Sequence, residues 1–434
     1  MMTRRQALIR TLFGVGAIGL RSLATGIPAA FLLNPRRALA NGMCAVPTKA
    51  QYFVLSTSGN GDPINAGAPG TYADTKIIHS MDPTMAPTSF QMGGKAYTAA
   101  KPWSTLPQNV LDRTTFWHLM TNTPIHPKEP EVLRLMGATA AHEMLPSLLA
   151  KVTAPCLNTV QAQPFSVGGS GPSEALSYNG SVMPIIPPVA LKDTLTAPAG
   201  LLTTLQAVRD TTMNSIYAMY KTTATPAEKA FIDATVNTQA QVRSLNQSLL
   251  STLSSINDNS VASQILATVT LIQMNVAPVI AMHIPFGGDN HTDTNLALET
   301  AQTVSGVASI AALMAQLQSA GLQDKVTFMT LNVFGRTLMT NGGGTAGNGR
   351  AHNPNHQVSV TIGAPFKGGV IGGVGAVAGD YGATGITSAT GASSSSGDVS
   401  AVDSLGAYAR TLLASVGGDP TVVSTGKVIP AALV

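Results

Sequence analysis

Two loops of this sequence carry the residues best suited to binding a metal ion. Asp289 and His291 are two positions apart in "GGDNH", and in an extended chain that spacing turns both side chains to the same side. A carboxylate and an imidazole together suit a divalent ion, with Zn, Mn and Ca as candidates. His352 and His356 follow in "HNPNH", where Pro354 favours a loop over a helix. Each pair also has a structural interpretation: an aspartate turn beside a surface histidine, or a polar loop held by hydrogen bonds to the backbone.

Arg336 is the candidate for binding an anion. It follows Gly335 directly after an apolar run, where a guanidinium is able to hold a phosphate or sulfate through two hydrogen bonds. An ion pair with a buried carboxylate, locking the loop, is the structural alternative. The glycine-rich stretch "NGGGTAGNGR" that follows lacks the GK[ST] ending of a nucleotide-binding loop. The sequence also has no G-x-S-x-G and no HExxH motif.

The elements that position these loops alternate as in an α/β protein. Apolar runs predict strands over 52–55, 326–331 and 358–362, and stripes at helical spacing predict helices over 260–274, 296–317 and 402–416. We therefore expect a mostly parallel central sheet with helices on both faces. Ligands bind beyond the carboxyl ends of the strands in such sheets. Asp62, which follows the first strand in "SGNGD", is thus expected to join the later loops at one site.

Other stretches are less regular. Residues 131–151 carry apolar side chains at helical spacing, and the region around 200–257 predicts a helical insertion beside the sheet. The Pro-, Gly- and Thr-rich residues 61–110 predict irregular connection, and residues 367–399, rich in Gly, Ala and Ser, predict a long surface loop. We expect residues 41–434 to form a single domain.

The first 40 residues resemble an export signal. Arg4 and Arg5 precede an apolar run that is interrupted by Gly, Arg and Pro, and "ALA" at 38–40 is a small-x-small cleavage site. Twin arginines before a modest apolar run are typical of the twin-arginine route, which exports folded proteins. We therefore expect a cleaved signal, the twin-arginine machinery as a partner, a periplasmic or secreted protein, and no membrane span in the mature chain. An ordinary secretory signal and a membrane anchor are the alternatives.

Composition agrees with an exported protein. Six of the 25 Lys and Arg lie in the first 40 residues, and the remaining 19 are outnumbered by 21 Asp and Glu. With no basic patch among aromatic residues, nothing predicts a nucleic-acid partner. Charged residues make up only 11% of the chain, well below the usual share. Cys44 and Cys156 either form one disulfide or remain two free thiols.

An ordered set of motifs resembles the exported bacterial domain-of-unknown-function 1501 family, relatives of the alkaline phosphatase and sulfatase superfamily. The set runs from "GNGDPIN" through "GGDNH", "LNVFGRT" and "NGGGTAGNGRAHN" to "FKGGVIGG". The family pattern has G-G-N-D-G-x-N, W-D-T-H, S-E-F-G-R-T and a D-H pair before a lysine-glycine-glycine turn. The resemblance spans most of the mature chain, and its specific motifs lie in the last third.

This resemblance implies an alkaline phosphatase-like fold and metal-dependent hydrolysis of a small phosphate or sulfate ester. Carried over position by position, it matches Asp62, Asp289, His291 and His352 to the family's metal-site positions and Arg336 to its arginine. For the nucleophile we select Thr123, which follows the apolar run 114–120 near His126, with Thr121 as the alternative. The candidate residues are therefore Arg336 and Thr123 for catalysis, and Asp62, Asp289, His291, His352 and His356 for the metal.

The sequence also departs from the family pattern. Asn332 and Val333 stand where the family has Ser-Glu, and Ala351 stands where it has the Asp of the D-H pair. Two absent carboxylates remove charge that would neutralise ions, which favours one ion over two. Two functions follow: a hydrolase with a reduced metal site, or a non-catalytic binding or cell-envelope assembly protein on the same scaffold.

Overall fold

A computed structural model describes the chain at residue 44, 46–168, 176–196, 211–212, 215–219, 221–225, 229, 247–339, 349–377 and 379–434. The expected export signal and most of the expected helical insertion lie outside these residues. The insertion's last described part is helical, α12 (Gln247–Ser254). Within the described residues, no helix combines the length and apolar character that crossing a membrane requires.

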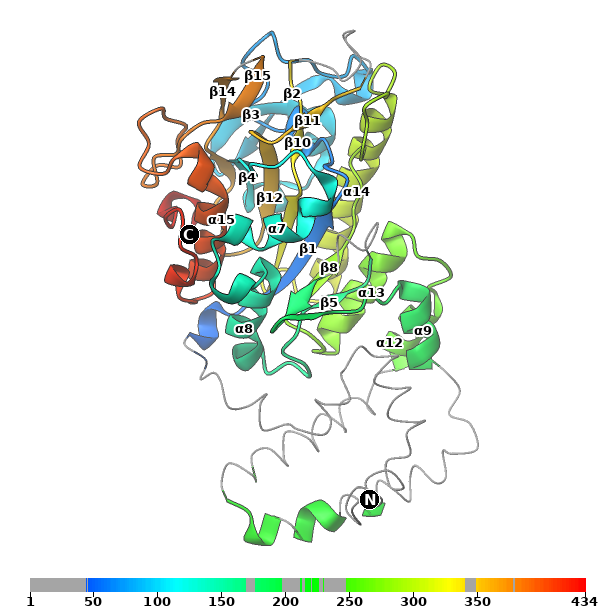
Figure 1. Ribbon diagram of the computed structural model, residues 1–434. Helices are drawn as coiled ribbons and strands as arrows, with labels where there is room; N and C mark the ends of the chain where they lie inside the picture. Colours follow the sequence, from blue (N-terminus) through cyan, green and yellow to red (C-terminus); the bar gives the residue numbers. More distant parts are fainter. Residues whose placement is uncertain are drawn as a thin grey trace, which may run out of the picture.

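A mostly parallel seven-stranded sheet forms the centre of the molecule, as predicted (Figure 1). In spatial order its strands are β13 (Gly369–Ile371), β4 (Thr114–Leu119), β12 (Gln357–Ile362), β9 (Val326–Asn332), β1 (Tyr52–Ser58), β8 (Val279–Met282) and β5 (Phe165–Ser166). Only β12 runs antiparallel to its neighbours β4 and β9. The other six strands point the same way.

Helices cover both faces of the sheet, because alternate side chains of each strand point to opposite faces. Val54 and Phe328 pack on one face with α13 (Val261–Gln273) and α14 (Ala297–Ser319). Phe53 and Met329 pack on the other with α8 (Leu145–Leu157) and α15 (Ser404–Ser415). Figure 1 shows α14 and α15 on opposite sides of the strands.

Further short elements lie around the sheet. The helices are α5 (Ile64–Gly67), α6 (Gln108–Leu111), α7 (Glu129–Leu133) and α9 (Pro188–Thr196). Two-stranded pairs are β2 (Pro87–Met92) with β3 (Lys95–Ala100), β6 (Ser177–Tyr178) with β7 (Ser181–Val182), β10 (Gly335–Arg336) with β11 (His352–Asn353), and β14 (Val374–Val377) with β15 (Asp380–Ala383).

Three local predictions were wrong. Residues 61–110 contain the β2–β3 hairpin, and residues 367–399 contain β13, β14 and β15. The helix expected over 131–151 is interrupted where Met136 and Ala141 adopt positive φ. Left-handed residues end a helix, so α8 begins only at Leu145, with Pro146 in its first turn.

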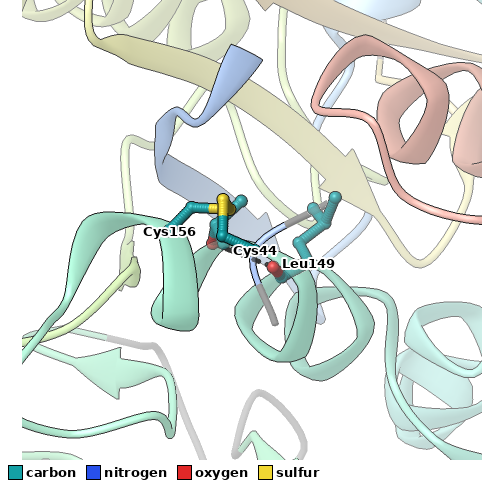
Figure 2. Close-up of a disulfide and its surroundings, with 4 residues drawn as sticks. Cys44, Leu149 and Cys156 are labelled. Carbon is teal, nitrogen blue, oxygen red and sulfur yellow. Dashed lines mark hydrogen bonds between the residues drawn. A yellow bond between two sulfur atoms is a disulfide. The ribbon is translucent and has the colours of Figure 1, made fainter. Parts of the chain in front are cut away.

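Cys44 and Cys156 form a disulfide, which settles the alternative that the sequence leaves open (Figure 2). The bond joins the chain just before β1 to the end of α8, where Cys44 lies beside Leu149. It connects residues 112 positions apart, so it ties the start of the described fold to a helix packed on the sheet.

Candidate metal centre

Polar loops from five strands meet at one edge of the sheet. β1, β4, β8 and β9 are mutually parallel, so their carboxyl ends lie at the same edge. Because β12 runs the opposite way, its amino end, preceded by His352 and His356, lies at that edge too. The convergence that the sequence predicts from strand exits is therefore present, with β12 adding a loop that enters rather than leaves a strand.

Four side chains from three of these loops form a group with metal-ligand geometry. They are His126, Asp289, His291 and His352, and one ligand atom from each lies within 4.8 Å of the others. The Nε2 atoms of His291 and His352 are 2.8 Å apart. Asp289 places Oδ1 3.2 Å from Nε2 of His291 and Oδ2 3.4 Å from Nε2 of His126. Ligands in a tetrahedral zinc site lie about 3.3 Å apart, since each Zn–N bond is about 2.0 Å.

Backbone carbonyls fix two of the three imidazoles in the orientation that a metal ligand needs. Nδ1 of His126 lies 2.8 Å from the Gly59 oxygen, and Nδ1 of His352 lies 2.6 Å from the Pro124 oxygen. A carbonyl oxygen only accepts, so Nδ1 carries the hydrogen in both rings and Nε2 presents a lone pair when the ring is neutral. A hydrogen bond of this kind on the far nitrogen is the usual support of a metal-binding histidine.

When its ring is neutral, His126 turns a lone pair toward an acceptor. In neutral His126, Nε2 turns its lone pair toward the Asp289 carboxylate at 3.4 Å. His291 and His352 bring two Nε2 atoms together while Nη1 of Arg336, which only donates, lies 3.5 Å from Nε2 of His291. A cation among these atoms would take up the His126 lone pair and pair with the Asp289 carboxylate. The donor set therefore fits a divalent ion.

Phe334 forms the apolar floor beneath the two carbonyl-bound imidazoles. Its ring stacks on His352 with centroids 4.4 Å apart and meets the edge of His126 at 4.9 Å. Phe334 itself is fully buried. Gly61 has a φ of +67°, and a Cβ there would overlap the Phe334 ring. The glycine of the first loop is thus required by the close approach of this floor.

Arg336 holds the carboxylate of the group. Its side chain is fully buried, with Nε donating to the Gly61 oxygen at 2.7 Å and Nη2 donating to Asp289 Oδ1 at 2.9 Å and to the Asn60 oxygen. Burial is the largest single influence and raises the pKa of Asp289, but the charge and the hydrogen bond of Arg336, together with His126 and His291, lower it by more, and the net pKa lies below its ordinary value. Burial and the Arg336 charge also lower the pKa of His352. Both groups are thereby held in the state that binds a cation.

The structure brings together three of the five predicted metal residues: Asp289, His291 and His352. Asp62 is buried nearby but outside the group, accepting from Ser58 Oγ at 3.1 Å and from the Phe286 backbone N–H at 3.3 Å. Through these contacts Asp62 connects the end of β1 to the loop that follows β8.

His356 and Thr123 are also placed away from the open side of the group. His356 is fully buried and pairs with His118, the two ring nitrogens lying 2.8 Å apart. Burial, and then the neighbouring His118, lowers the pKa of His356 well below its usual value. Thr123 is buried, and its hydroxyl accepts from the Ile125 backbone N–H at 3.3 Å.

His126 is the group member that sequence reasoning missed. It follows β4, and the sequence signal was present, since an apolar run leads into "TNTPIH". What the sequence does not supply is strand order. β4 lies beside β12 in the sheet, although 237 residues separate the end of one from the start of the other, and this adjacency carries His126 to His352.

Comparison with known proteins gives a family match over part of the chain. Among curated proteins, no relative matches the chain. The crystal structure of Ps i-CgsB in complex with k-i-k-neocarrahexaose covers 88% of this chain and 76% of its own, at 10% identity and a TM-score of 0.36. A likeness of that degree carries no argument about fold or activity. Residues 191–390 match the model of a family described as protein of unknown function (DUF1501). That match spans less than half of the chain, and it supports a likeness to the DUF1501 family over the segment that carries Asp289, His291, Arg336 and His352.

Proposed function

We propose that this chain is a metal-dependent hydrolase of small phosphate or sulfate esters that works with a single divalent ion. One observation carries the proposal: three imidazole Nε2 atoms and one carboxylate converge at the strand-end edge where α/β proteins bind ligands. When bound, such an ion polarises an ester oxygen and acidifies a water molecule. The choice of phosphate or sulfate esters as substrates rests on the resemblance of the sequence motifs to the DUF1501 pattern.

The donor set favours a particular kind of ion. Three of the four donors are imidazole nitrogens, which suit Zn and other late first-row ions. Calcium takes six to eight oxygen ligands, and this group offers one carboxylate. Manganese likewise prefers oxygen ligands, so from the original candidates we propose Zn and set manganese and calcium aside.

The chain's own residues have separable roles in this proposal. His126, His291 and His352 hold the ion, and Asp289 supplies the negative charge that a divalent ion needs. Arg336 orients Asp289 and, being fully buried, acts as a positioning residue instead of a clamp on the ester. The side chain of Asp289 is 47% exposed, so the group opens to solvent and is accessible to a small substrate. Thr123 is buried, and we assign the attack to water.

Elemental analysis and an ester assay test the proposal. The purified protein, disulfide intact, is expected to hold about one Zn per chain and to cleave an aryl phosphate or aryl sulfate. His291→Ala and Asp289→Ala are expected to lose both. His142→Asn is the matched control, because His142 is an exposed histidine outside the group and asparagine tolerates its positive φ. A wild-type protein without bound metal would refute the proposal.

A non-catalytic metal-binding protein is the second candidate. Val333 and Ala351 stand where the family pattern has acids, and the Arg336 guanidinium is engaged within the protein. Stoichiometric metal with no ester turnover that depends on Asp289 would select this second function over the first.

We propose further that the protein is exported by the twin-arginine route to the periplasm or beyond. The Arg4-Arg5 leader supports this, and so does the Cys44–Cys156 bond, since disulfides persist in oxidising compartments. Replacing Arg4 and Arg5 with lysines is expected to leave the protein inside the cell. Export unchanged by that replacement would contradict the twin-arginine route.

A further inference from the structure

A buried ion pair lies beneath the metal-binding loops and takes no part in the ligand set. Arg350 and Glu299 are each only 2% exposed. Arg350 donates from Nε to Oε2 of Glu299 at 2.7 Å and from Nη2 to Oε1 at 3.1 Å. This two-point contact fixes the guanidinium and the carboxylate in one mutual orientation. Glu299 lies in the first turn of α14, where the helix dipole also favours a negative charge.

The ion pair is joined to the loop that carries two of the ligands. Asn290, which stands between Asp289 and His291, donates from Nδ2 to Oε2 of Glu299 at 3.1 Å. The Asn290 carbonyl accepts from the backbone N–H of Arg350 at 3.0 Å. Both members of the pair therefore hold Asn290, and the proposed ligands Asp289 and His291 are its two neighbours in the chain.

The same arginine is joined to the segments that carry His352 and Arg336. Arg350 lies two residues before His352, and its Nη1 donates to the Thr337 carbonyl at 2.8 Å. In the β10–β11 pair, Arg336 is directly opposite His352. Thr337 extends this pairing, because its N–H donates to the Ala351 oxygen at 3.0 Å. The pair thus links three of the segments that meet at the metal group.

Gly349 sets how closely the two histidine loops approach. Its φ is +86°, and a Cβ at this position would overlap the carbonyl oxygens of Asn290 and His291. The backbone before Arg350 is therefore in direct contact with the backbone that carries His291. No side chain fits between the loops at this point.

We infer that Gly349 and the Arg350–Glu299 ion pair are positioning residues that set the distance between His291 and His352 and thereby the affinity of the metal centre. The inference rests on the metal binding proposed above. Metal–ligand distances tolerate changes of about 0.2 Å, so a shift of one loop by the width of a methyl group removes a ligand. Loss of a supporting contact behind a metal ligand typically weakens metal binding about 10- to 100-fold.

Cobalt titration of single variants tests the inference, because Co²⁺ takes nitrogen and oxygen sites like those of Zn²⁺ and its visible spectrum reports coordination geometry. Gly349→Ala closes the space between the loops, and Glu299→Gln removes the charge while keeping the shape. Gly321→Ala is the matched control: its φ is +66°, and nothing lies within 4 Å of its Cβ position. It therefore introduces the same backbone strain with no contact at the loops.

Gly349→Ala and Glu299→Gln are expected to weaken Co²⁺ binding at least about 10-fold and to alter the visible spectrum, whereas Gly321→Ala keeps both wild-type values. Thermal unfolding of the three variants measures the loss of stability that each substitution causes. Because Gly321→Ala also loses stability, a weaker Co²⁺ affinity in Gly349→Ala alone is due to the position of the loops and not to lower stability. If Glu299→Gln fails to fold, the Co²⁺ affinity and spectrum of Gly349→Ala alone test the inference. Wild-type affinity and spectrum in Gly349→Ala would overturn the inference while leaving the proposed function intact. A wild-type protein that binds no Co²⁺ would overturn both.

Discussion

Replacing Arg336 with methionine is the sharpest test of how the site is built. The buried guanidinium donates to the carbonyls of Asn60 and Gly61 and to the Asp289 carboxylate. Methionine fills a similar apolar volume and donates nothing. The substitution therefore leaves two loop carbonyls without their donor and frees Asp289 from its only guanidinium contact among the described residues.

The expected cost follows from these three contacts. A buried carbonyl left without a donor costs about 1–3 kcal/mol, which applies to Gly61, whereas the contact to the Asn60 carbonyl is only part-buried and costs about 1 kcal/mol. The Asp289 side chain is 47% exposed, so solvent screening limits its pairing with Arg336 to about 1 kcal/mol. We expect Arg336→Met to lower the free energy of unfolding by about 3–4 kcal/mol. Arg336→Lys should recover less than half, because one ammonium cannot reproduce the planar fork.

Urea unfolding followed by tryptophan fluorescence measures this cost, since Trp103 and Trp117 are both fully buried in the fold. Arg113→Met is the control, because Arg113 makes an exposed ion pair with Asp324 and such pairs contribute about 0–1 kcal/mol. If Arg336→Met and Arg113→Met lower the free energy of unfolding equally, then Arg336 does not hold the first loop and the assignment fails.

Three further outcomes are expected. Cys156→Ser, which opens the bond to Cys44, should lower the unfolding free energy by about 3–5 kcal/mol because that bond closes a long loop; reductant should reproduce the loss in the wild type and add nothing in the variant. Burial lowers the pKa of His79 and of His118 to about 4, so the unfolded chain binds more protons between pH 6.5 and 4. Urea titrations across that window should show stability falling as pH falls, by up to about 3 kcal/mol for His118 alone. Val333→Glu, which restores the family's acid, should destabilise the fold by about 4 kcal/mol without raising metal content in elemental analysis.

The sequence predicted the parts of the fold that local pattern controls. The apolar runs at 52–55, 326–331 and 358–362 became β1, β9 and β12, each as a buried strand. The stripe over 296–317 became α14. The pattern failed where backbone conformation outweighs apolar spacing, at the left-handed Met136 and Ala141. It also failed over 367–399, where β13 pairs with an edge of β4 that the sequence does not reveal and β14 pairs with β15.

For the site, spacing predicted pairs of residues, and topology decided which pairs met. Asp289 and His291 share one loop, so their two-residue spacing was enough to place them together. His352 and His356 share a loop as well, but they point apart: one faces the group, and the other is buried against His118. Loop geometry of this kind depends on how β10 and β11 pair, which no spacing rule encodes.

The absent acids of the family pattern have a physical explanation in this fold. Val333 is fully buried within the core cluster that includes Leu331 and Phe334, so a carboxylate there would be surrounded by apolar side chains. Phe334 instead supports His126 and His352 from below. A neutral imidazole costs less to bury in apolar surroundings than a carboxylate does; backbone carbonyls orient His126 and His352, and Arg336 orients the one carboxylate. A site richer in histidine and poorer in acid is therefore what this apolar floor supports, and it favours one nitrogen-bound ion over a pair of oxygen-bound ions.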